Sequence, residues 1–297
     1  MSRQHILAVL LIGAGLLGAS ATLADRGSIP FRPHVQIFEP VQRAMIAWNG
    51  DEEILLLSTD LRASEPTKVL EVLPLPAEPT VAKGDTEVFR RATDLINRKL
   101  AEERPATSGK ALRAEPKGPA GEVTFHERIG AHDISVTKAL SSAGFTDWVN
   151  DYLRKAGVEN PQISPTMMEL IGEYLRDKYE WFVFDVVELG TEPRTNDAIQ
   201  YRFASAYLYY PLRISRVEEG ETEIQLLVLT PKLLREFPAL PRERVQLAHD
   251  PVTVTGDELQ ALNPDMHALL GRRAAQQLRI WMLHGRLDAF TADLIAK

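Results

Sequence analysis

The sequence predicts an α+β fold made mainly of antiparallel sheet with peripheral helices. The dipeptide Asn49-Gly50 lies between two strand-like runs and is a strong hairpin signal, because both residues tolerate positive φ. A second observation is the run rich in Val and Phe at residues 181–189, which is typical of a strand. A third is the helical apolar stripe within residues 85–103. Hairpins combined with separate helices are typical of the α+β class.

The composition is that of an ordinary globular protein. The chain has 297 residues, of which 44% are hydrophobic and 25% are charged. The net charge of -7 argues against a nucleic-acid partner, because such proteins usually present a basic face. The absence of cysteine excludes disulfides, thiol catalysis and cysteine-ligated zinc. No phosphate-binding loop occurs after residue 24, and no cofactor is predicted.

Residues 1–24 are predicted to be an export signal. Arg3 supplies positive charge, residues 6–17 form an uncharged apolar run, and small residues follow. A run of about a dozen residues is short of the roughly 20 that a membrane-spanning helix needs. We therefore expect cleavage near Ala21 or Ala24, and a periplasmic or secreted chain with no transmembrane segment.

Residues 25–103 are predicted to form a β-meander followed by a helix. A two-residue hairpin loop would pair Trp48 with Asp51. Residues 54–57 are apolar on both faces, which is typical of a central strand covered on both sides. Residues 69–73 would add a third strand beside this hairpin, ended by the prolines that follow. One apolar stripe of the helix consists of Val88, Ala92, Leu95, Ile96 and Leu100.

The rest of the chain is predicted to complete the same domain. Residues 104–121, rich in Pro, Gly and charge, form a flexible loop. Residues 122–235 form an α+β segment. Its strands are expected at 123–140, 181–189, 202–217 and 223–230, with Gly220 in the turn between the last two. Its two helices are expected to begin at Thr146 and at Ser164-Pro165. Residues 236–297 form a helical segment, whose last helix places Ala274, Leu278, Trp281, Met282, Gly285 and Leu294 on one side.

Several features in this order resemble a known family. They are the hairpin, Leu73-Pro-Leu-Pro-Ala-Glu-Pro79, Ile129-Gly-Ala-His-Asp-Ile-Ser135, Trp148 with Tyr152, Tyr174 before Trp181-Phe-Val-Phe184, and Tyr210-Pro-Leu-Arg-Ile-Ser215. Across residues 30–235 the chain is similar to the exported bacterial family catalogued as domain of unknown function 2330. Members often carry cysteines near the mature start, where this chain has Asp25-Arg-Gly-Ser-Ile-Pro30, and some end in a membrane anchor that this sequence lacks. The resemblance implies no known activity and transfers no catalytic residue.

Titratable residues offer two hypotheses for chemistry. His132, Asp133 and Asp185 form a candidate titratable cluster, with Asp185 half-buried in its strand. A metal site from His126-Glu127 and His132-Asp133 is disfavoured, because an extended strand holds positions 126 and 132 about 20 Å apart, and no metal is predicted. A hydrolase triad could combine His249-Asp250 with one of three serines, Ser135, Ser205 or Ser215, although no nucleophile-elbow motif occurs.

Tyrosines offer a hypothesis for binding. Tyr207 and Tyr209 would project from the same face of one strand, as a candidate face for a ligand or partner. Half-buried packing is the competing interpretation. The sequence therefore predicts an exported protein of unknown activity, most simply a non-catalytic cell-envelope module that binds an envelope protein or a glycan. The alternative is an exported hydrolase that uses His/Asp or carboxylate groups, and the oligomeric state is not predicted.

Overall fold

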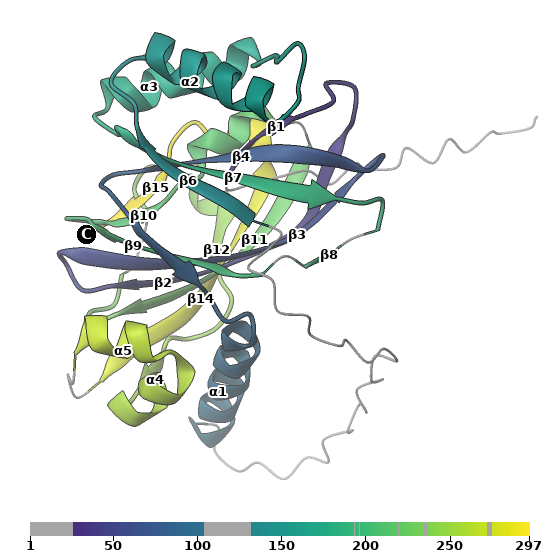
Figure 1. Ribbon diagram of the computed structural model, residues 1–297. Coiled ribbons are helices and arrows are strands. Elements are labelled where there is room, and N and C mark those ends of the chain that lie inside the picture. Colours follow the sequence, from purple (N-terminus) through teal and green to yellow (C-terminus); the bar gives the residue numbers. More distant parts are fainter. Residues whose placement is uncertain are drawn as a thin grey trace, which may run out of the picture.

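The structure is a computed structural model that describes residues 26–103, 132–192, 194–195, 197–218, 220–234, 237–271 and 275–297. These residues form four layers: two helices, a smaller sheet, a larger sheet and three further helices (Figure 1). Helices α2 (Ser142–Lys155) and α3 (Pro165–Arg176) cover the smaller sheet, and α1 (Glu87–Glu103), α4 (Gly256–Leu262) and α5 (Pro264–Leu270) cover the larger one. The predicted α+β class is confirmed.

The smaller sheet is antiparallel, and the larger sheet contains one parallel pair among its described strands. The smaller sheet has the order β1 (Gly27–Pro30), β4 (Thr67–Leu75), β7 (Trp181–Leu189), β6 (His132–Lys138). The larger sheet has the order β12 (Val245–Leu247), β14 (Gln276–Arg286), β11 (Glu221–Thr230), β2 (Ile37–Trp48), β3 (Glu52–Ala63), β9 (Ile199–Ala204), β5 (Thr80–Lys83). Strand β11 runs parallel to β2.

Short elements complete the described chain. Strand β13 (Val252–Val254) pairs with β14, and β8 (Arg194–Thr195) pairs with β3. A separate two-stranded sheet consists of β10 (Leu208–Tyr210) and β15 (Leu294–Ala296). Three 3₁₀ turns are η1 (Arg213–Val217), η2 (Arg242–Arg244) and η3 (Leu287–Ala289).

The predicted hairpin is present, but its predicted register is wrong. Trp48 pairs with Glu53 instead of Asp51. The Asn49 side chain accepts hydrogen bonds at 2.9 Å from the backbone N–H groups of Asp51 and Glu52, and the Asn49 N–H donates to the Glu52 carbonyl at 3.2 Å. The turn is therefore centred on Gly50 and Asp51, and Gly50 adopts a positive φ of 111°. A register change of two residues leaves every side chain on its predicted face, because strand alternation has a period of two.

The central strand is covered on both sides, as predicted. Leu55 and Leu57 of β3 belong to the core between the two sheets, while Ile54 and Leu56 pack against α1, α4 and α5. The predicted stripe of α1 makes this second contact, since Val88 and Ala92 are fully buried there. The two halves of the chain around residues 104–121 share both sheets, because β3 pairs with β9 and β4 pairs with β7.

Two strand assignments from the sequence are wrong. Residues 69–73 do not flank the hairpin, because β4 lies in the smaller sheet between β1 and β7. Pro74 does not end the strand and lies opposite Phe182. It is tolerated because β1 pairs with β4 only as far as Val72, so that the edge of β4 beside Pro74 needs no backbone donor. Residues 202–217 do not form one strand, because they are divided among β9, β10 and η1. Strand β11 therefore does not pair with them across the turn at Gly220, and pairs with β2 and β14.

The predicted last helix is also wrong, because residues 276–286 form the strand β14 between β11 and the short strands β12 and β13. Its apolar residues face both layers: Leu278 and Ile280 face the helices, and Trp281 and Leu283 face the smaller sheet. A strand buried on both faces shows no alternation, and its spacing can imitate a helical stripe. Among the earlier helices, Ser164 caps α3 as predicted, whereas α2 starts at Ser141 rather than at Thr146.

Candidate functional site

A row of polar side chains crosses the smaller sheet on the face that packs against the larger sheet. Ser28 of β1 lies opposite Glu71 of β4, which in turn lies opposite Asp185 of β7. His132 of β6 hydrogen bonds through Nδ1 to Asp185 Oδ2 at 2.6 Å. Arg26, just before β1, forms an ion pair with Glu71, and its guanidinium lies 3.6 Å from Asp185 Oδ2.

This row is sealed from solvent. The side chains of His132 and Asp185 are only 2% and 3% exposed. Burial raises the pKa of Glu71, and the nearby positive charge of Arg26 opposes that rise. Burial also raises the pKa of Glu218, at the end of η1, to about 7, although its carboxylate accepts a hydrogen bond from the Ser28 N–H at 3.1 Å. Burial therefore disfavours the charged forms of both carboxyl groups, and their contacts with Arg26 and with the Ser28 N–H offset part of that cost.

The structure brings together two of the three predicted titratable residues. His132 and Asp185 touch, but Asp133 points to the opposite face of the sheet, because neighbouring strand residues alternate. There Asp133 accepts a hydrogen bond from the Tyr152 hydroxyl at 2.9 Å. Burial, followed by this hydrogen bond, raises the pKa of Tyr152 to about 12. Asp185 is more deeply buried than the half-buried position predicted for it.

The candidate hydrolase groups do not assemble. The buried Nε2 of His132 has no hydrogen-bond partner in the part of the chain that the structure describes, so no serine hydroxyl reaches it. Ser135 lies on the helix-facing side of β6, Ser205 bonds to the Tyr207 carbonyl, and Ser215 is buried in η1. His249 bonds to backbone atoms, through Nδ1 to the Asp250 carbonyl oxygen and through Nε2 to the Ile280 N–H.

The candidate metal ligands give no site among the described residues. His126 and Glu127 lie outside those residues. Within them, no group of three His, Cys, Asp or Glu side chains converges in a way that could hold a metal ion. Within the same residues, no helix is long and apolar enough to cross a membrane.

The two tyrosines of the predicted face differ in exposure, because Tyr209 is buried and Tyr207 is half-buried. Tyr209 is 0% exposed, and its hydroxyl donates to the Pro74 carbonyl at 3.1 Å. Tyr207 is half-buried, and its hydroxyl lies 3.0 Å from the hydroxyl of Tyr179. The reason is that β10 pairs with β15 and packs in the core instead of continuing β9 along the sheet. Tyr209 therefore packs inside the fold, away from the surface.

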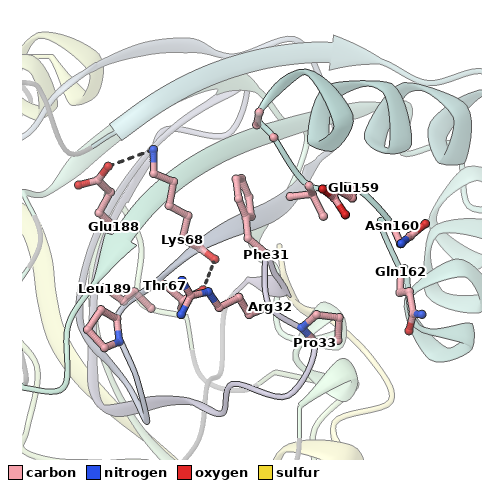
Figure 2. A pocket seen from close by; sticks show the side chains of 14 residues that line it. Phe31, Arg32, Pro33, Thr67, Lys68, Glu159, Asn160, Gln162, Glu188 and Leu189 are labelled. Carbon is pink, nitrogen blue, oxygen red and sulfur yellow. Dashed lines mark hydrogen bonds and ion pairs between the residues drawn. The ribbon is translucent and has the colours of Figure 1, made fainter.

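An open groove lies on the helix-facing side of the smaller sheet (Figure 2). Its volume is about 680 Å³. One side consists of the segment after β1 (Phe31, Arg32) with the start of β4 and the end of β7, and the other is the turn from α2 to α3, residues 156–162. In Figure 2 the Phe31 ring stands between Lys68 and that turn. Gly157, with φ of 92°, lets the chain leave α2 sharply and form this wall.

A second hollow of about 350 Å³ continues the groove toward β6. It shares four lining residues with the first: Phe31, Lys68, Ala156 and Glu188. Its far end contains Asp133 and Tyr152, and the Tyr152 ring stacks on Trp148 with centroids 5.3 Å apart. His132 borders this hollow, but its ring remains buried on the other side of the strand.

A family model described as an uncharacterized protein conserved in bacteria, domain of unknown function 2330, matches residues 21–277. The chain belongs to this family. The match extends the resemblance seen in the sequence over most of both sheets and confirms it. No curated protein matches the chain.

Solved structures of another protein, baculovirus P35, show a weak structural similarity to this chain. The crystal structure of baculovirus P35 has a TM-score of 0.44 and 8% sequence identity, covering 91% of this chain and 99% of that chain. The caspase-8/P35 complex gives a TM-score of 0.37 and 9% identity, covering 87% of this chain and 96% of that chain. At these TM-scores the likeness establishes no shared activity.

Proposed function

We propose that this chain is an exported protein of the bacterial cell envelope that binds an envelope ligand in the groove without transforming it. The observation that carries the proposal is a difference in solvent exposure between the buried titratable pair and the open groove. The side chains that could perform chemistry, His132 and Asp185, are sealed between the sheets. The side chains of the groove, including Arg32, Asn160 and Gln162, are exposed. Open concave sites with a few polar groups are where ligands bind.

The export part of the proposal is supported by residues 1–24 and by the position of Arg26. Cleavage after Ala24 would leave Arg26 as the second residue of the mature chain, directly before β1. The signal could thus be removed without losing a described core residue. Sequencing the amino terminus of the exported protein tests this, and an intact Met1 would overturn it.

A co-sedimentation experiment tests the binding part. The mature protein is mixed with isolated envelopes and pelleted, alongside the groove variant Phe31→Ala/Asn160→Ala and the control Arg98→Ala, which changes an exposed residue of α1. We expect the wild type and the control to pellet with the envelopes, and the groove variant to stay in the supernatant. Equal pelleting of all three proteins would refute the groove as the binding site.

A second candidate function, hydrolysis, is favoured by one contact. A carboxylate that orients a histidine through Nδ1, as Asp185 does for His132, is the arrangement of a catalytic dyad. Hydrolysis is disfavoured by the burial of both side chains, and by the fact that no hydroxyl among the described residues bonds to His132 Nε2. The variant His132→Gln separates the two functions: a hydrolase would lose its activity toward envelope material, whereas a binding module would keep its co-sedimentation.

A further inference from the structure

We infer that the groove takes a neutral, hydroxyl-rich oligosaccharide, with the Phe31 ring as its stacking platform. The inference rests on the proposed function and names the ligand class. The two hollows share Phe31, so that one aromatic ring stands where they meet and a second, Tyr152, stands at the far end. A linear chain of pyranose rings, each with an apolar C–H face that can stack on an aromatic ring, can follow such a path.

The Phe31 platform is held in place by its backbone. The Phe31 N–H donates to the Lys68 carbonyl at 2.9 Å, and the ring is partly buried against the core cluster. At the far end, Tyr152 is held by its hydrogen bond to Asp133 and by its stack on Trp148. Rings fixed in this way lose little entropy when a ligand stacks on them, and they offer broad apolar area.

The charges of the larger hollow cancel. Its lining contains two cations, Arg32 and Lys68, and two anions, Glu159 and Glu188. Lys68 and Glu188 already form an ion pair at 3.1 Å. A polyanion or a polycation would meet as much repulsion as attraction here. A neutral ligand is not penalised in this way.

The remaining polar groups suit hydroxyls. The exposed amides of Asn160 and Gln162 each offer a donor and an acceptor and lie along the α2–α3 turn in Figure 2. A sugar hydroxyl is likewise both donor and acceptor. An amide can therefore bond either way to it, while charged side chains of both signs bond to its oxygen or its hydrogen.

Isothermal titration with neutral tetrasaccharides (tetra-N-acetylchitotetraose, cellotetraose and maltotetraose) tests the inference. We expect at least one of them to bind the mature protein, with affinity independent of salt. Phe31→Ala should weaken that binding about tenfold, as expected for loss of an aromatic contact. Phe31→Leu, which keeps an apolar side chain against the core, serves as the second variant should the alanine protein unfold.

Arg32→Gln is the discriminating variant. With a neutral ligand it should change affinity less than about threefold, whereas an anionic ligand would lose about tenfold or more and show strong salt dependence. If envelope binding depends on the groove but neutral tetrasaccharides neither bind nor compete, the oligosaccharide inference is wrong and the proposed function stands. If the groove variants leave envelope binding intact, both are wrong.

Discussion

The buried ionic residues show how single side chains constrain this protein. Arg26 forms an ion pair with Glu71 inside the fold, and His132 forms a hydrogen bond with one carboxylate oxygen of Asp185. Buried charges are tolerated only when paired, since an isolated one loses its hydration. The candidate cluster predicted from the sequence therefore contains a real contact, His132 with Asp185, and both side chains are buried between the sheets.

Replacing Arg26 should be costly. Arg26→Ala leaves Glu71 buried without its cation, and breaking such a pair typically costs about 3–5 kcal/mol. We expect the free energy of unfolding, measured by denaturant titration, to fall by that amount. Arg98→Ala, which removes an exposed pair with Glu258, should cost less than about 0.5 kcal/mol. A loss in Arg26→Ala no larger than in this control would show that the row is not sealed.

Glu218 should make stability depend on pH. Its pKa is about 7 in the folded chain, above the ordinary 4.5. Between these values the folded state keeps a proton that the unfolded state loses, so this group's contribution to stability falls as pH rises through that window. Glu218→Gln should raise the free energy of unfolding by about 1–3 kcal/mol near pH 8 and change it little near pH 4. The exposed control Glu102→Gln should differ little at either pH. An equal gain for Glu218→Gln at both pH values would show that ionisation of Glu218 is not the cause.

At the scale of elements, the N-cap of helix α2 differs between the sequence prediction, Thr146, and the structure, Ser141. The Ser141 side chain accepts a hydrogen bond from the Gly144 N–H at 3.1 Å, which satisfies a donor at the start of the helix. The hydroxyl of Thr146, the predicted cap, instead donates to the Ser142 carbonyl one turn earlier. Both residues are good caps in isolation, and the packing of Phe145 against Phe182 favours the earlier start.

The two candidate caps should respond differently to substitution. Ser141→Ala should lower the free energy of unfolding by about 1 kcal/mol, because the Gly144 N–H loses its partner. Thr146→Ala should have a smaller effect, since an intrahelical hydroxyl bond adds little. Thermal or denaturant unfolding of both variants provides the measurement, and a larger loss for Thr146→Ala would indicate that the helix starts where the sequence alone suggested.

At the scale of the whole molecule, β14 ties the C-terminal segment into the larger sheet. It pairs with β11 over ten residues and with β12 and β13 on its other side. A chain that ends at residue 271 should therefore lose cooperative unfolding and its near-ultraviolet circular dichroism. Had residues 274–294 formed the peripheral helix expected from their spacing, the truncated chain would stay folded, and that outcome would contradict the structure.

Local patterns were predictable from the sequence, and long-range partners were not. The strand at residues 181–189, the stripe of α1 and the cap at Ser164 depend on near neighbours and are correct. Which sheet β4 joins, and whether residues 276–286 are strand or helix, depends on strands far away along the chain: Leu75 of β4 pairs with Trp181, and Glu221 of β11 pairs with Arg286. The groove was missed because its sides come from four separate segments, none with a pattern of its own.

Hydrogen–deuterium exchange of the mature protein, alone and in the presence of isolated envelopes, tests the central claim, that the groove binds and the buried residues do not. We expect slower exchange at residues 31–33 and 156–162, with residues 207–209 unchanged. Protection at residues 207–209, or binding that leaves both groove segments unprotected, would contradict the claim.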